Sequence, residues 1–248
     1  MKARYKSELP TEGLDLESLM ETLFYRDEFL TLASHELKTP LTSIKLQAQV
    51  FKRNAKKNSA ITYTKEQVDK MVDQVDIQTS HLINLVEKML DISRIRSGQF
   101  HMTKNDFNVS ELLHEIVLKS QANICAKIDA DIFMTGDRER IAQVFTKIIN
   151  NAARYGKGLP IEVKLVQRKT KISFLVTDQG AGISSEDQKR LFHRFQRAVA
   201  ASEVSGLGLG LYIAREIVEA HNGKISLKSE PDKGSIFKVD FRREGLDE

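Results

Sequence analysis

The stretch LASHELKTPL, Leu32 to Leu41, places a histidine, an acid and a threonine in an otherwise helical segment and then adds a proline. Proline has no amide hydrogen, so Pro40 leaves the carbonyl of Glu36 without its helical partner and predicts a bend just below His35. Our hypothesis is that this bend lets the helix around His35 move relative to the helix that follows. The stretch therefore indicates a functional segment and not only a packed one.

The sequence around this stretch predicts two long helices. No glycine occurs between Gly13 and Gly98. Apolar residues recur at alternating steps of four and three from Leu16 to Phe51, and again from Val68 to Met89, a repeat typical of helices packed in a coiled coil or bundle. Two helices alone bury little apolar surface. We therefore expect a hairpin that pairs with a second copy, giving a homodimer with a four-helix bundle.

The second half has the pattern of a mixed α/β domain, with nine of the thirteen glycines between Gly156 and Gly234. Ser110 is the expected N-cap of its first helix. Alternating apolar residues predict strands, and apolar residues at helical spacing predict helices. The expected helices are 110–121, 138–155 and 208–221, and the expected strands are 161–167, 171–178, 224–229 and 235–241.

Composition limits the classes of function. A chain of 248 residues with 41% apolar and 29% charged residues suits one large or two modest globular domains. The net charge of +4 contains no dense basic block, which argues against a nucleic-acid partner. The single Cys125 excludes a disulfide framework and favours a reducing, cytoplasmic compartment. Because no apolar run approaches the roughly 20 residues of a membrane span, we expect membrane attachment only if this is the inner part of a longer protein.

Four short motifs of the second half carry its chemistry. They are NNAARYG at 150–156, DQGAGI at 178–183, LFHRFQR at 191–197 and GLGLGL at 206–211. Taken singly, they can be a helix end, a turn, an amphipathic turn and a flexible linker. These separate interpretations do not explain why all four follow HELKTP in this order and spacing.

FLTLASHELKTPLTSI, at 29–44, and the four motifs together resemble the cytoplasmic core of a two-component sensor histidine kinase, over about Leu14 to Phe241. The resemblance implies a multidomain α and α+β protein. A helical hairpin forming a dimeric four-helix bundle would be followed by an α/β sandwich, the Bergerat-type ATP-binding domain. The implied division is an N-terminal segment at 1–13, the dimerisation and histidine-phosphotransfer hairpin at 14–98, and the catalytic ATP-binding domain at 104–248.

The resemblance also assigns roles within the hairpin. His35 is the implied phosphoacceptor, and its place one step beyond the apolar repeat predicts an exposed ring. A neutral imidazole nitrogen is a good nucleophile near neutral pH. Glu36 is the implied general base, which orients and deprotonates the second ring nitrogen. Thr39, on the same helix face, is implied to position water for dephosphorylation of the partner.

In the second domain the resemblance implies ATP and Mg2+ as cofactors. Asp178 would accept the adenine amino proton, Tyr155 would stack on adenine, and Asn151 would coordinate Mg2+. Arg154 would face the phosphates, and Arg197 would stabilise charge during transfer. The remaining implied nucleotide contacts are small residues, with Gly180 and Gly182 beside the base, Gly206, Gly208 and Gly210 along the phosphates, and Ser235 supporting the adenine pocket.

One position departs from the family pattern. Lys147 stands where the family has an asparagine, and this lysine could contact phosphate directly or compete with the metal. The expected function is ATP-dependent autophosphorylation of His35 and transfer to an aspartate of a response regulator, with regulator phosphatase activity. Two alternatives stay open: a kinase-weakened protein that acts mainly as a phosphatase through Thr39, and a nucleotide-binding scaffold that sequesters a regulator. The intact SHELKT argues against the scaffold.

Overall fold

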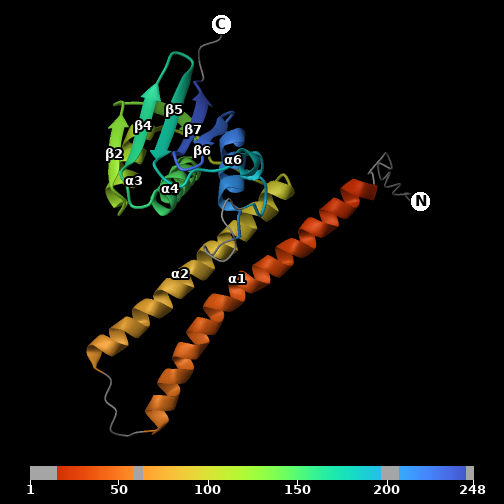
Figure 1. The fold of residues 1–248 in the computed structure, drawn as a ribbon, viewed down its shortest axis with the longest axis vertical. Helices are drawn as coiled ribbons and strands as arrows, with labels where there is room; N and C mark the ends of the chain where they lie inside the picture. Colours follow the sequence, from red (N-terminus) through yellow and green to blue (C-terminus); the bar gives the residue numbers. More distant parts are fainter. Residues whose placement is uncertain (1–15, 58–63, 197–206, 244–248) are drawn as a thin grey trace, which may run out of the picture. The chain divides into compact units, whose positions relative to one another are not determined.

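The computed structural model of the chain describes residues 16–57, 64–196 and 207–243 (Figure 1). Arg197, Gly206 and the segment 1–13, for which the sequence made predictions, lie outside these ranges. The chain divides into two compact units, one up to Leu82 and the other from Ile83. None of the described helices is both long and apolar enough to span a bilayer.

The predicted hairpin helices are α1, Leu16–Lys57, and α2, Lys65–Arg96. α1 runs through Pro40, which is buried, and Figure 1 shows that the axis of α1 changes direction about midway along the helix. The helix therefore accommodates the proline without ending.

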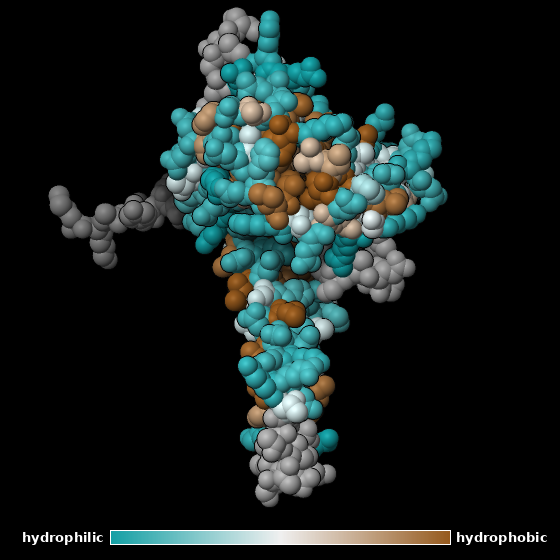
Figure 2. Space-filling model, turned by 90° about the vertical axis from the view of Figure 1, so that its left-hand side faces the viewer, coloured by the Kyte–Doolittle hydropathy of each residue, from teal (hydrophilic) through white to brown (hydrophobic). Residues whose placement is uncertain are grey.

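Both hairpin helices expose large apolar side chains, and the space-filling view shows them as brown among teal along the helical part (Figure 2). The exposed apolar residues are Leu30, Leu41, Leu46 and Val50 on α1 and Val72, Ile77, Ile83, Val86 and Leu90 on α2. Four of these exposed residues, Leu30, Leu41, Val72 and Val86, belong to the predicted apolar repeat.

The second unit is built on a five-stranded sheet in the order β2-β4-β5-β7-β6. β2 and β4 are parallel and the other neighbours are antiparallel, while β1 and β3 form a separate antiparallel pair. The strands are β1 Asn105–Asn108, β2 Ile124–Ile128, β3 Phe133–Gly136, β4 Ile161–Gln167, β5 Lys171–Asp178, β6 Lys224–Glu230 and β7 Gly234–Arg242. The four strands expected from the sequence are confirmed.

Helices cover one face of this sheet. They are α3 Val109–Lys119, α4 Arg138–Tyr155, α5 Ser185–Arg190 and α6 Gly210–Ala220. Buried side chains alternate along β4 and along most of β5 and β7. The core lies on the helix-covered face, where Phe145 of α4 stacks on Phe174 of β5 at 4.0 Å between ring centroids. The predicted α/β sandwich following a helical hairpin is confirmed.

One predicted helix cap is wrong. The N-cap of α3 is Asn108, whose Oδ1 accepts from the backbone N–H groups of Ser110 and Glu111. The Ser110 hydroxyl instead donates to the carbonyl of Asp129 at 2.7 Å and accepts from the N–H of Ile132 at 3.1 Å. Tertiary contacts, not capping, therefore explain why serine occupies this buried position.

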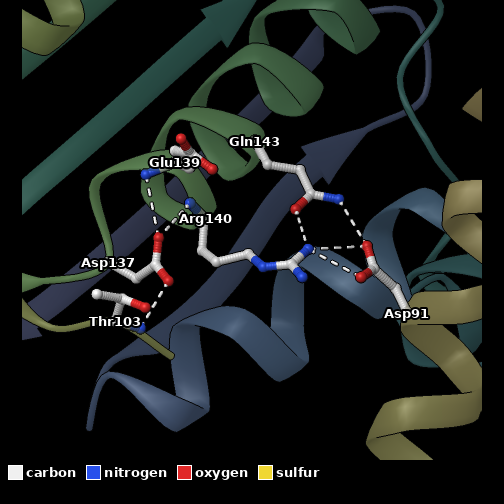
Figure 3. A network of polar contacts seen from close by, with 6 residues as sticks. All are labelled: Asp91, Thr103, Asp137, Glu139, Arg140 and Gln143. Atoms are coloured by element: carbon white, nitrogen blue, oxygen red, sulfur yellow. Dashed lines mark hydrogen bonds and ion pairs between the residues drawn. The ribbon is translucent and has the colours of Figure 1, made fainter. Parts of the chain in front are cut away.

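A polar network joins the last turns of α2 to α4 within the second unit (Figure 3). Nη1 of Arg140 lies 2.9 Å from Oδ1 and 3.0 Å from Oδ2 of Asp91, and the Gln143 amide donates to the same carboxylate at 3.2 Å. Asp137, the N-cap of α4, also accepts from the N–H of Thr103 at 3.0 Å, and Thr103 lies in the connector, residues 97–104, between α2 and β1. α4, which carries several of the predicted site residues, is thus fixed at its first turn.

Candidate functional site

The hairpin part of the site is a short polar face of α1. The side chain of His35 is 79% exposed, as predicted, and Glu36 Oε1 lies 4.0 Å from its Nδ1. The carboxylate is on the Nδ1 side of the ring, which leaves Nε2 for a phosphoryl group. Thr39 is exposed one turn further, and its hydroxyl donates to the His35 carbonyl at 3.2 Å.

The centre of the second-unit part is Asp178, a buried carboxylate at the end of β5. Its Oδ1 accepts from the N–H of Gly180 at 2.9 Å, and Ser235 faces it across the β5–β7 pair. Burial raises the pKa of Asp178, although backbone hydrogen bonds from Gly180 and Ser235 act in the opposite direction. A buried carboxylate oxygen of this kind can accept a hydrogen bond from the edge of a flat base.

Glycines let three segments approach each other beside Asp178. A Cβ on Gly180 would overlap the carbonyl oxygen of Tyr155 at the end of α4. Gly182 has φ of +69°, and a Cβ there would overlap the carbonyl oxygen of Glu230 on β6. Any larger residue at either position would push apart the strand, the helix end and the turn that surround Asp178.

Ser229 of β6 holds the turn after Asp178 in place. Its hydroxyl accepts from the N–H of Ile183 at 2.8 Å, donates to the Gly234 carbonyl at 2.7 Å and lies 3.0 Å from the Ser235 hydroxyl. Ser235 is buried beside Ser229, and its support of an adenine pocket stays a prediction. Sequence analysis missed Ser229, because a serine on a strand carries no distinguishing signal.

The last turns of α4 carry three predicted contacts. Asn151 is half-buried, Arg154 is exposed, and Tyr155 is 39% exposed with the Arg154 guanidinium 6.0 Å from its ring centre. The described residues contain no cluster of three or more His, Cys, Asp or Glu side chains suited to a metal. An amide oxygen plus substrate phosphates is nevertheless an ordinary environment for Mg2+, so Asn151 fits that ion.

The N-terminus of α6 forms the remaining described side. Gly208 has φ of +66°, and α6 begins at Gly210 with no side chain capping its first amides. Such free backbone amides and the positive end of the helix dipole favour phosphate.

Lys147 of α4 lies beside this helix start. A Cβ on Gly210 would overlap Cε of Lys147 and stand 2.7 Å from its Nζ. Burial lowers the pKa of Lys147 to about 8, and repulsion by Lys88 of α2 and by Arg154 acts in the same direction. Sequence analysis identified Lys147 but missed Lys88, because a lysine within a heptad pattern indicates only a solvated helix face.

In the second unit, Tyr155, Gly180 and Ser235 lie beside Asp178. The other predicted contacts lie on α4, which carries Asn151 and Arg154, on the turn at Gly182, and at the start of α6, with Gly208 and Gly210; α4 and α6 are in contact. His35, Glu36 and Thr39 belong to the first unit.

Two family models match the chain. Residues 25–98 match the His Kinase A (phospho-acceptor) domain. Residues 136–245 match the histidine kinase-, DNA gyrase B- and HSP90-like ATPase. The first match contains His35 and the second contains every predicted nucleotide contact.

Curated relatives and a solved structure show the same similarity. The chain is 30% identical to the sensor protein KdpD of Clostridium acetobutylicum over 88% of its own length and 25% of the relative's. It is 28% identical to the adaptive-response sensory kinase SasA of Thermosynechococcus vestitus, over 95% and 64% of the two lengths. The chain thus spans less than two thirds of either relative. The structure of the Acinetobacter baumannii histidine kinase AdeS matches with a TM-score of 0.62 at 22% identity, covering 85% of this chain and 98% of that one, and supports the fold.

Proposed function

Because this chain carries the catalytic core of a two-component sensor histidine kinase, we propose that it transfers the γ-phosphoryl group of ATP to His35 and then to an aspartate of a response regulator. The observation that carries the proposal is the exposed His35 ring beside Glu36, in a chain that also holds an ATPase-type domain with a buried Asp178. The reaction would take place in the cytoplasm, whether the chain acts alone or as the inner part of a membrane-bound sensor.

The geometry at His35 suits nitrogen as the nucleophile. Nε2 attacks the γ-phosphorus, the bond from that phosphorus to its bridging oxygen breaks, and ADP leaves. The Nδ1 proton passes to the carboxylate of Glu36, which lies on that side of the ring. The product is a phosphohistidine with an uncharged ring. In the second step the regulator's aspartate attacks the phosphorus, the N–P bond breaks, and the departing imidazole regains a proton at Nδ1.

The nucleotide would be held by the residues gathered around Asp178. The Asp178 carboxylate would accept a hydrogen bond from the adenine amino group, and Tyr155 would stack on the base. The backbone amides at the start of α6 would donate to the phosphates. Mg2+, held by the Asn151 oxygen and phosphate oxygens, would neutralise charge on the transferring group. Arg197 and Gly206, which lie outside the described residues, are proposed phosphate contacts from the sequence motifs alone.

Exposed apolar residues on α1 and α2 support a homodimer. Leu41 and Val72, both members of the predicted apolar repeat, are 53% and 55% exposed in the single chain. A second copy that packs its hairpin against this one would bury them in a four-helix bundle. The receiver domain of a response regulator is the second proposed partner.

Incubation with γ-labelled ATP and Mg2+ tests the kinase. Acid-labile label is expected on the wild type and on His81→Gln, a matched control on the exposed face of α2, and should fall to background in His35→Gln. Equal labelling of His35→Gln and the wild type would contradict the proposed phosphoacceptor.

We also propose that Thr39 supports hydrolysis of the regulator's phosphoaspartate, because its hydroxyl lies one turn from His35 on an exposed face. Thr39→Ala should slow regulator dephosphorylation roughly tenfold or more, as expected for loss of a water-positioning group, and leave His35 labelling intact. Thr42→Ala, on the same exposed helix, is the control. An unchanged rate of regulator dephosphorylation in Thr39→Ala would contradict the proposed role of Thr39.

A further inference from the structure

Lys147 has an unusual environment for a lysine. It lies on α4, and its stem fills the space that the missing side chain of Gly210 leaves at the first residue of α6. The ammonium group is therefore held at the helix start whose backbone amides have no side-chain cap. The Lys147 stem thus occupies the space in front of Gly210.

The charges around Lys147 have the same sign. Lys88 of α2 and Arg154 of α4 both repel its ammonium group, and no carboxylate of the described chain forms an ion pair with Lys147. Burial also lowers the pKa of Lys88, with Glu87 only partly opposing it. Removing a cation from water without a counterion is costly. A protein retains such a group where an anion binds.

The anion must bring several negative charges to the start of α6. A lysine ammonium is a point charge that binds phosphate without demanding one orientation, and the amides of α6 add hydrogen bonds and the helix dipole. A nucleotide with its base at Asp178 would bring its phosphate chain along this side of α4. The charges and amides of this site are therefore suited to binding a di- or triphosphate group.

We propose that Lys147, assisted by Lys88, contacts the β- or γ-phosphate of the bound nucleotide and replaces part of the charge neutralisation that Mg2+ supplies. This inference rests on the proposed nucleotide site but makes a separate claim. The nucleotide should bind with little dependence on Mg2+, since Lys147 remains when the metal is removed.

Calorimetric titration of the whole chain with ADP, once in EDTA and once with Mg2+, tests this claim. In EDTA, Lys147→Met should weaken ADP binding roughly tenfold to a hundredfold, the value of one charge-assisted phosphate contact. Lys147→Arg should stay within about threefold of the wild type because it keeps the charge. Lys147→Asn should bind ADP well only when Mg2+ is present. Lys88→Met should bind ADP roughly threefold more weakly than the wild type in EDTA.

Lys119→Met, an exposed lysine at the end of α3, is the matched control and should bind as the wild type does. Tripolyphosphate should also displace ADP from the wild type in EDTA, a measurement that needs no variant to fold. Equal affinity of Lys147→Met and the wild type in EDTA, or failure of tripolyphosphate to compete, would overturn the inference. Absence of any ADP binding would overturn the nucleotide site as well, whereas ADP binding without label on His35 would overturn only the kinase.

Discussion

Asp178 is a carboxylate that folding has partly removed from water at the place where a base would bind. Its raised pKa reflects burial that outweighs the hydrogen bonds from Gly180 and Ser235. The N–H of Gly180 donates to its Oδ1, so the side chain presents acceptor oxygens at this position. It can therefore distinguish a base with an exocyclic amino group from one with a carbonyl there.

We predict that Asp178→Asn loses this discrimination. The wild type should bind ATP roughly tenfold or more tightly than inosine triphosphate, as expected for a buried polar group left unpaired, whereas Asp178→Asn should bind both weakly and with similar affinity. Asp131→Asn, an exposed aspartate in the β2–β3 turn, should keep the wild-type ratio. Competition binding measures the ratio, and an unchanged ratio in Asp178→Asn would exclude contact with the amino group.

His221 gives the second unit a defined response to pH. Its Nδ1 donates to the Ile217 carbonyl at 2.7 Å, and its Nε2 accepts from the N–H of Asp137 at 2.9 Å. Both bonds together require the neutral ring. Burial lowers the pKa of His221 below its ordinary 6.5, with Lys104 acting in the same direction and Ile217 and Asp137 opposing.

Stability should consequently fall on acidification. Above the ordinary pKa both folded and unfolded chains hold a neutral His221, so this group adds no pH dependence there. As the pH decreases through 6.5, the unfolded chain takes up a proton that the folded chain does not, and unfolding becomes easier by up to about 1.4 kcal/mol per pH unit.

Urea unfolding at several pH values between 7.5 and 5 measures this slope. His221→Leu should flatten the pH dependence, and His101→Gln, at an exposed histidine, should not. Equal slopes in the wild type and His221→Leu would show that another group carries the acid sensitivity.

The last turns of α2 illustrate how an element is fixed by a few polar contacts. Asp91 is 4% exposed, and Arg140 both pairs with it and lies 4.8 Å from the ring centre of Phe100 in the connector. These contacts hold the segment that carries Lys88 against α4, where Lys147 lies. The arrangement of the two lysines therefore depends on Asp91.

Asp91→Ala should release these turns. The change leaves the Arg140 charge half-buried and unpaired, a loss of about 3 kcal/mol, and hydrogen exchange in residues 83–96 should accelerate by roughly a hundredfold. Asp76→Ala, at an exposed position of the same helix, should exchange as the wild type does. Unchanged exchange in Asp91→Ala would mean that apolar contacts such as those of buried Ile92 hold the segment alone.

Elements with strong periodicity could be predicted from the sequence. β4 alternates buried and partly exposed residues over most of its length, and the helix expected at 138–155 matches α4. β2 was missed because most of its five side chains are exposed, so no alternation marks it. Asp178 and Lys147 could be identified from motifs, whereas the roles of Lys88 and Ser229 depend on neighbours that only the folded chain provides.

For the whole molecule, the exposed apolar surface of the hairpin is the feature that a monomer does not explain. Leu46 on α1 is 59% exposed and Val72 on α2 is 55% exposed. Such exposed apolar residues support the homodimer proposed above, in which a second copy would cover them.

The double change Leu46→Glu and Val72→Glu should weaken the dimer. Burying two carboxylates in an apolar interface should raise the dissociation constant at least about a hundredfold. Gln49→Glu with Gln74→Glu adds the same charge to exposed polar positions of the same helices and should leave the dimer intact. Light scattering during gel filtration reports the mass, and a dimer that survives the first pair but not the second would place the interface elsewhere.

The most direct test of the central claim is to locate the phosphoryl group. The chain is incubated with ATP and Mg2+, digested at neutral pH, and its phosphopeptides are sequenced by mass spectrometry. We predict a single acid-labile phosphohistidine, at His35. An acid-stable phosphate on serine or threonine, a phosphohistidine at another position, or a chain that binds ATP and stays unmodified would contradict the assignment of this protein as a histidine kinase acting through His35.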